Sequence, residues 1–389
     1  MTLFLLTLLT LGFTNPPHTP SWQPQVSGTS SGLRGVCAVS AKVAWASGEH
    51  GTVLRTVDGG ATWQKLSVQG GGELDFRDIH AFDAREAFVL SIGPGALSRI
   101  YRTADGGRSW RLQFTNPDSK AFYDGFAFWD RKHGIAVSDS VNGKFPLLAT
   151  DDGENWRPLQ PDTLPAALPE EGCFAASGTS IAVGGKTDAW FVTGGPAARI
   201  FHSDDSGMNW TVVQSPILSG AASQGAFSVA FRDNHIGVIV GGDYEKPNGA
   251  DRIAAWSQDG GKRWAPAATG PRGFRSAVAF VPGSSPLVWV AVGTNGSDCS
   301  MDDGNLWRPL DSASYNAVSF APSGDGWVVG PKGVVARWKS HRRRECRLRV
   351  VLDIVDRLLV GLDSVLHMMN RGLAPSERLH VVLLKLYVA

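Results

Sequence analysis

The chain has 389 residues, with high contents of glycine (46) and tryptophan (14), and only 19% of its residues are charged. A formal net charge of +1 provides no overall field that would attract nucleic acid or an anionic membrane, so we expect neither as a partner. Abundant glycine and aromatic residues with little charge are typical of many short strands joined by tight turns.

The first segment of the chain is apolar. Residues 1–13 read MTLFLLTLLTLGF, and two prolines follow at 16 and 17. This length matches the apolar core of a signal peptide and is too short to span a membrane, although a basic start and an A-x-A-like cleavage motif are missing. We interpret residues 1–20 as a signal-like segment and linker, and expect an exported protein (periplasmic, lumenal or extracellular). A mis-assigned start or a simple apolar tail is the alternative.

A motif of the form Ser/Thr-x-Asp-x-Gly-x-x-Trp then recurs six times, and only the third copy departs from it, with Ala149 at the hydroxyl position. The tryptophans are 43 to 54 residues apart, which is the length of one four-stranded propeller blade. The key pairs of the six copies are Asp58 and Trp63, Asp105 and Trp110, Asp151 and Trp156, Asp205 and Trp210, Asp259 and Trp264, and Asp302 and Trp307.

The chemistry of this motif is that of a hairpin turn. The Asp carboxylate can accept backbone N–H groups across the turn, and the Gly allows a positive φ. The Trp starts the next strand and packs between blades, where it buries about 150–250 Å². These residues are therefore interpreted as structural.

Three strand-like runs precede each motif, for example residues 36–39, 43–46 and 53–55, so each motif leads into a fourth strand. Six motifs define six blades. Residues 317–321, 326–330 and 334–338 supply three more strands without a motif, and we infer that a segment near 22–26 is the missing fourth strand. Residues 21–340 are thus predicted to form an all-β, seven-bladed propeller closed non-covalently by an N-terminal strand.

Residues 341–389 do not share this pattern. The stretch contains no Trp or Phe, residues 341–347 are strongly basic, and residues 350–369 could form an amphipathic helix. Three interpretations compete: a helical element that binds a partner or a membrane surface, a helix pair packed on the propeller, and a poorly ordered non-native end.

In a propeller, equivalent positions of successive blades form rings around the axis. Aligning the inner strands places five residues on one ring at the mouth opposite the motifs: Arg34, Arg77, Asp124, Arg275 and Tyr315. Three arginines on one ring suggest a site for an anion or an acidic partner; solvated arginines at a channel rim are the alternative. The loops of this mouth add further candidate partner-binding residues: Glu49, Asp139, Asn142, Lys144, Asp243, Tyr244 and Lys246.

The six motifs resemble the Asp-box, or BNR, repeats of sialidases and related propellers. Residues 21–340, including Gly-Trp-Val-Val-Gly-Pro-Lys-Gly at 326–333, resemble the photosystem II stability/assembly factor group. That resemblance implies a seven-bladed fold and a role in binding a protein, but bacterial members also occur outside photosynthesis. Asp boxes are structural turns on the face away from the usual site, so they indicate the fold rather than the function.

We favour a monomeric, non-enzymatic scaffold that binds a protein or peptide through one mouth, possibly as an assembly or stability factor. A sialidase-like glycoside hydrolase is the first alternative, although Arg-Ile is nowhere followed by Pro, and Tyr244 and Glu245 are neighbours whose side chains would point apart on a strand. An oxidoreductase with a cofactor in the channel is the second. The four cysteines have no metal-ligand spacing and no dinucleotide fingerprint is present, so we assign no catalytic residue, cofactor or metal.

Overall fold

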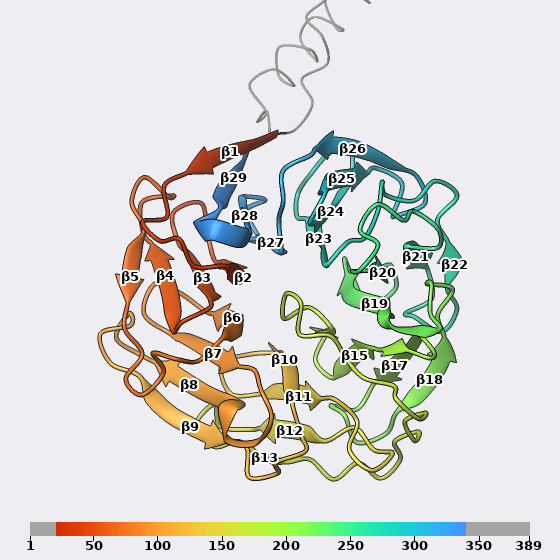
Figure 1. Cartoon of the computed structure of the whole chain (residues 1–389), viewed down its shortest axis with the longest axis horizontal. Helices are drawn as coiled ribbons and strands as arrows, with labels where there is room; N and C mark the ends of the chain where they lie inside the picture. The colour runs from red at the N-terminus through yellow and green to blue at the C-terminus, as the bar shows by residue number, and fades with distance from the viewer. Residues whose placement is uncertain (1–20, 340–389) are drawn as a thin grey trace, which may run out of the picture. The chain divides into compact units, whose positions relative to one another are not determined.

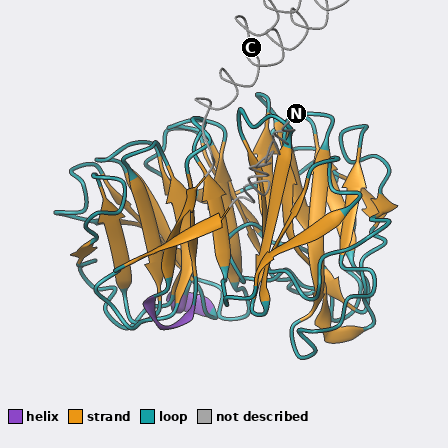
Figure 2. Cartoon of the chain, turned by 90° about the horizontal axis from the view of Figure 1, so that it is seen from above, coloured by secondary structure: helices purple, strands orange, loops and turns teal. Residues whose placement is uncertain are grey.

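The computed structural model describes residues 21–339, so the expectations for residues 1–20 and 341–389 lie outside the described residues. The described chain forms seven antiparallel sheets around a central channel (Figure 1), with strands running between two loop-bearing faces (Figure 2). This confirms the prediction of a seven-bladed β-propeller. Within the described range, no helix is long and apolar enough to cross a membrane.

Each blade has four strands, numbered here from the channel outward. The blades are β2 (Leu33–Ala38), β3 (Ala44–Gly48), β4 (Thr52–Thr56) and β5 (Gln64–Leu66); β6 (Phe76–Ala81), β7 (Ala87–Ser91), β8 (Arg99–Thr103) and β9 (Arg111–Thr115); β10 (Tyr123–Phe128), β11 (Gly134–Ser138), β12 (Leu147–Thr150) and β13 (Arg157–Pro158); β14 (Ile181–Gly184), β15 (Asp188–Val192), β17 (Arg199–Ser203) and β18 (Thr211–Gln214); β19 (Ala221–Phe231), β20 (Gly237–Asp243), β21 (Ala254–Ser257) and β22 (Ala265–Pro266); β23 (Ala277–Val281), β24 (Val288–Gly293), β25 (Gly296–Ser300) and β26 (Trp307–Asp311); and β27 (Ala317–Phe320), β28 (Gly326–Val329), β29 (Val335–Lys339) and β1 (Ser21–Gln25). The short β16 (Gly194–Gly195) pairs with β19.

Strand β1 closes the ring, as predicted. It pairs antiparallel with β29, from Ser21 opposite Lys339 to Gln25 opposite Val335. The Trp22 indole packs against Trp338, with ring centroids 4.8 Å apart. The amide oxygen Oε1 of Gln25 accepts indole N–H groups from two blades, and its Nε2 donates to a backbone carbonyl of the first Asp-box turn. The seam between the last blade and the first is therefore closed by specific side-chain contacts as well as by strand pairing.

Five of the six boxes form the turn expected from the sequence. In the first, Oγ1 of Thr56 donates to Asp58 Oδ1 at 2.8 Å and accepts the backbone N–H of Gly60. The other oxygen of Asp58 accepts the Thr62 hydroxyl at 2.6 Å. These hydrogen bonds to the charged carboxylate lower the pKa of Asp58 to about 2. Tryptophans that follow the boxes pack in the apolar clusters between neighbouring blades.

The third box corrects the sequence alignment. Thr150, not Ala149, supplies the hydroxyl, and it donates to Asp152 at 3.2 Å rather than to Asp151. Asp152 also accepts the backbone N–H and the side-chain amide of Asn155. The turn is thus one residue shorter than the others, and Asp151 instead pairs with Arg157 on the surface. Assigning Asp151 as the structural aspartate was wrong.

This correction predicts opposite outcomes for two adjacent, chemically identical substitutions. Asp152→Asn should lower the melting temperature, because it weakens the charge-assisted bonds of the turn. Asp151→Asn should leave the melting temperature unchanged, because a surface ion pair contributes little. Thermal unfolding followed by circular dichroism compares the two variants directly, and a greater loss in Asp151→Asn would restore the original alignment.

Candidate functional site

The mouth opposite the Asp boxes is formed where the inner strands begin and where the second strand of each blade turns into the third. Leu33 at the start of β2 pairs with Gly48, which pairs with Thr52, while the box follows Thr56 at the other end of the blade. The 3₁₀ turns η1 (Gly95–Leu97) and η2 (Pro331–Gly333) occupy two of these mouth loops. Candidate residues on these starts and loops therefore share one face.

Four inner strands carry a β-bulge at this mouth. The extra residue is Arg34 in β2, Arg77 in β6, Asp124 in β10 and Phe227 in β19. A bulge twists its strand and re-aims the side chain. The alignment therefore placed three ring members at equivalent positions but missed Phe227, which stands two residues before a strand valine just as Arg34 does.

Arg34 and Arg77 form the cationic part of the mouth. Arg77 donates from Nε to Asp75 at 2.9 Å and from Nη1 to the carbonyl oxygen of Ala175 at 3.1 Å. Arg34 has its Nε buried without a hydrogen-bond partner among the described residues, and so is Oδ1 of Asp75. Burial and the neighbouring charge of Arg77 lower the pKa of Arg34. The two guanidiniums are thus held close together with hydrogen-bonding capacity unused.

Asp124 and Asp139 form an acidic pair beside the arginines. Asp124 is 1% exposed, and its Oδ2 lacks a hydrogen-bond partner in the described chain. Burial, and then the charge of Asp139, raise the pKa of Asp124 well above its usual value. Burial also raises the pKa of Asp139 to about 6, although Oδ1 of this residue accepts the N–H of Cys173 at 2.8 Å. The pair therefore carries less negative charge than two exposed carboxylates would.

Arg275 and Tyr315 differ from the open positions expected for them. Arg275 is fully buried and pairs with Asp298, so its charge is already satisfied within blade 6. Tyr315 is 4% exposed and donates its hydroxyl to Asp311 Oδ2 at 3.0 Å. The expectation of three ligand-facing arginines is corrected to two, because the acidic partner of the third lies on the adjacent strand β25.

The loop candidates fall into two groups. Glu49 accepts the backbone N–H of Gly32 at 3.1 Å, and Asp243 accepts Gln224 and the N–H of its own turn, so both carboxylates hold local backbone. The exposed candidates are Asn142 and Lys144 at a tight hairpin, and Tyr244 and Lys246 after β20. The side chains of this second group are available to a partner.

A loop that the sequence analysis did not single out crosses the channel. Residues 172–180 precede β14 in blade 4, yet Ala175 accepts Arg77 of blade 2. Ser177 donates to the Ser276 carbonyl of blade 6 at 2.9 Å, and Thr179 donates to Ser228 of blade 5 at 2.7 Å. Figure 1 shows this segment inside the ring. It occupies the channel where the oxidoreductase alternative requires a cofactor, and it forms a floor beneath the mouth.

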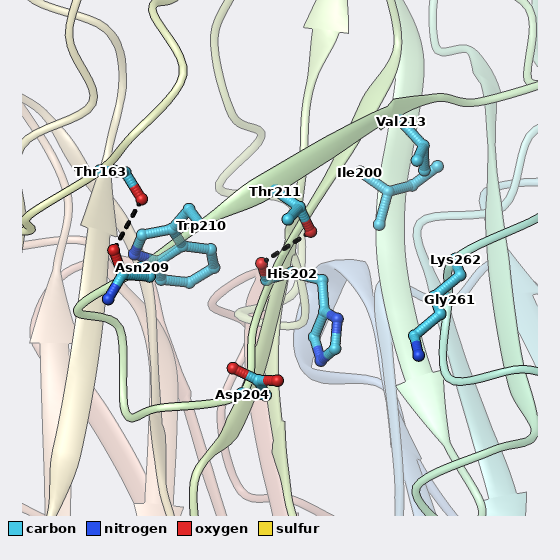
Figure 3. A pocket seen from close by; sticks show the side chains of 10 residues that line it. All are labelled: Thr163, Ile200, His202, Asp204, Asn209, Trp210, Thr211, Val213, Gly261 and Lys262. Atoms are coloured by element: carbon cyan, nitrogen blue, oxygen red, sulfur yellow. Dashed lines mark hydrogen bonds between the residues drawn. The ribbon is translucent and has the colours of Figure 1, made fainter.

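A separate pocket of about 390 Å³ lies on the outer surface between blades 4 and 5 (Figure 3). His202 at its centre donates to or accepts from Asp188 at 3.0 Å and stacks on Trp190. Asp204 is the single carboxylate among the lining residues, and none of them is a tyrosine. Glycoside hydrolysis requires a carboxylate pair or an activated tyrosine, so this pocket does not offer that chemistry.

The fold and the mouth define an Asp-box propeller with a basic and acidic polar mouth above a closed channel. No family model matches the chain. It is 27% identical over 260 residues to the photosystem II assembly protein Ycf48 of Synechococcus sp. (strain JA-2-3B'a(2-13)), a match covering 57% of this chain and 70% of that protein. It is 29% identical over 183 residues to the protein of the same name from Synechococcus sp. (strain JA-3-3Ab), covering 45% and 47% of the two chains.

Solved structures agree with this fold. YCF48 bound to D1 peptide is similar with a TM-score of 0.58 and 14% identity, over 84% of this chain and 99% of that one. YCF48 from Cyanidioschyzon merolae matches with a TM-score of 0.58 and 18% identity, over 82% and 98%. A streptogramin B lyase also reaches a TM-score of 0.59 at 10% identity, over 82% and 98%, so these likenesses describe the fold alone. Together with the sequence relatives, they show that the chain resembles the photosystem II assembly factor group.

Proposed function

We propose that this protein is a monomeric, non-enzymatic scaffold that binds a protein or peptide at the mouth, in the manner of an assembly or stability factor. The observation that carries this proposal is the group of unsatisfied buried polar atoms at one place: Arg34 Nε, Asp75 Oδ1 and Asp124 Oδ2. Buried polar atoms normally have hydrogen-bond partners, and unpaired ones mark a position where a ligand completes the set. Both donors and acceptors are unpaired, as the N–H and C=O groups of a peptide would require.

The sequence relatives support the same function, since they are named photosystem II assembly proteins, and a propeller of similar fold has been solved with a D1 peptide bound. We propose the same kind of partner, a segment of another protein, for this chain. Export across a membrane is also proposed, on the apolar residues 1–13.

The proposal is tested by affinity capture from a native extract of the source cells with the full chain as bait. We expect a specific protein to be retained by the wild type and lost with Arg34→Ala/Arg77→Ala, because the paired cations are removed. Arg108→Ala/Lys262→Ala is the matched control, since it removes the same charge from exposed positions on the Asp-box side. Equal retention by all three proteins would place the binding surface elsewhere. If nothing is retained, hydrolysis of a sialoside is measured next.

A further inference from the structure

A group of aromatic side chains lies beside the cations of the mouth. The rings of Phe174 and Phe227 are stacked, with centroids 3.8 Å apart and an interplanar angle of 8°. Tyr244 meets both of them edge-on, at 6.4 Å and 6.1 Å, and Phe274 packs against Phe227 from below at 4.7 Å. We call Phe174, Phe227 and Tyr244 the aromatic shelf.

Local backbone is shaped to accommodate this shelf. A Cβ on Gly194 would lie 2.2 Å from Cε2 of Phe174, and one on Gly225 would lie 2.8 Å from the same atom. Two glycines on neighbouring strands therefore leave the space that the Phe174 ring occupies. The turn that carries Tyr244 is fixed as well, because its N–H donates to the Ser223 carbonyl and Asp243 caps the turn.

The shelf nevertheless remains partly open to solvent. Phe227 and Phe274 are buried, Phe174 is half-buried, and Tyr244 is 49% exposed. An exposed aromatic residue on a rigid support is typical of the central residues of protein interfaces, which are enriched in tyrosine.

The shelf and the arginines belong to one continuous surface. Arg77 donates to the carbonyl of Ala175, the residue that follows Phe174. One residue step is about 3.8 Å, so the shelf lies within roughly 10 Å of the Arg77 guanidinium. An extended peptide covers that distance with about three residues.

We infer that the mouth recognises a protein segment that carries an acidic group and, about two to four residues away, an aromatic side chain that packs on the aromatic shelf. This inference rests on the proposed function and specifies its partner. Charge decides against the other natural occupant of an aromatic surface, a cationic side chain, because Arg34, Arg77 and Lys246 lie on the same mouth and would repel it.

Fluorescence anisotropy with the full chain and labelled ten-residue peptides tests the inference. The panel carries an Asp-Glu pair with a Trp two, three or four residues away, and each peptide has a Trp→Ala and an Asp-Glu→Asn-Gln counterpart. We expect the best complete peptide to bind about tenfold more tightly than its Trp→Ala counterpart. Tyr244→Ala should abolish that Trp-dependent gain, and Tyr244→Phe should retain it. Met301→Ala, at an exposed apolar residue of an Asp box, is the control and should change nothing.

The outcomes separate this inference from the function on which it rests. If peptides bind through the Asp-Glu pair and the arginines but Trp adds nothing, the inference is overturned and the binding function stands. If the Trp-dependent gain survives Tyr244→Ala, the aromatic side chain packs elsewhere and the inference is also overturned. If no peptide of the panel binds, both the inference and a peptide-binding mouth are rejected.

Discussion

A chain that begins at Ser27 should lose a large part of its stability, about 5 kcal/mol, because it lacks β1. The half-buried Trp22 accounts for roughly 2–3 kcal/mol of this loss. The three hydrogen bonds of Gln25 account for about 1 kcal/mol each. The edge of β29 would in addition be left unpaired, which favours aggregation.

Chemical denaturation of two truncated chains measures this effect. A chain beginning at Thr19 retains every residue of β1 and serves as the control. Gln25→Ala in the full chain isolates the contribution of the hydrogen bonds. Equal free energies of unfolding for the chains beginning at Thr19 and Ser27 would show that the ring is stable without its closing strand.

Removing Asp298 should be comparably severe, with an expected loss of about 3–5 kcal/mol, because it leaves the charge of Arg275 buried without its partner. Arg275 donates to Asp298 Oδ2 from Nε at 2.8 Å and also from Nη2, and both side chains are at most 1% exposed. The more exposed Arg272 shares the same carboxylate at 3.4 Å. Denaturant unfolding of Asp298→Ala provides the measurement.

Two further variants show whether the loss comes from the buried charge. Arg275→Met/Asp298→Leu should be more stable than Asp298→Ala, because apolar residues of similar size can replace a buried ion pair at little cost. Asp251→Ala breaks the exposed pair with Arg252 and should cost at most about 1 kcal/mol. If Asp298→Ala is as mild as Asp251→Ala, the guanidinium of Arg275 has access to solvent and would again be a candidate for ligand binding.

The propeller could be predicted from the sequence because each blade repeats the same local chemistry. A hydroxyl, an aspartate and a glycine within five residues specify a turn without reference to the rest of the chain, and Trp22 resembled the tryptophans that begin other outer strands. The third box shows the limit of this approach. The run Ala149-Thr150-Asp151-Asp152 allows two alignments, and only the hydrogen bonds distinguish Thr150 with Asp152 from the pair that spacing favoured.

The candidate site was less accessible to sequence reasoning, since it depends on contacts between blades. The alignment placed Arg34, Arg77 and Asp124 at equivalent positions, and their role as ligand-binding residues remains a prediction. Burial of Arg275 depends on Asp298, a residue of another strand that no repeat position identifies. The loop of residues 172–180 has no counterpart in other blades, so no alignment could reveal that it crosses the channel.

The pairing of β1 with β29 also has a mechanical consequence. Ser21 and Lys339 face each other at the end of the seam, so the polypeptide enters and leaves the propeller at neighbouring points on the Asp-box side. Tension applied between these two points would load the five residue pairs of the seam one after another, as in a zipper, rather than all together in shear. The strand that contributes most to closing the ring at equilibrium is therefore also the one that a small force on the two ends would detach first.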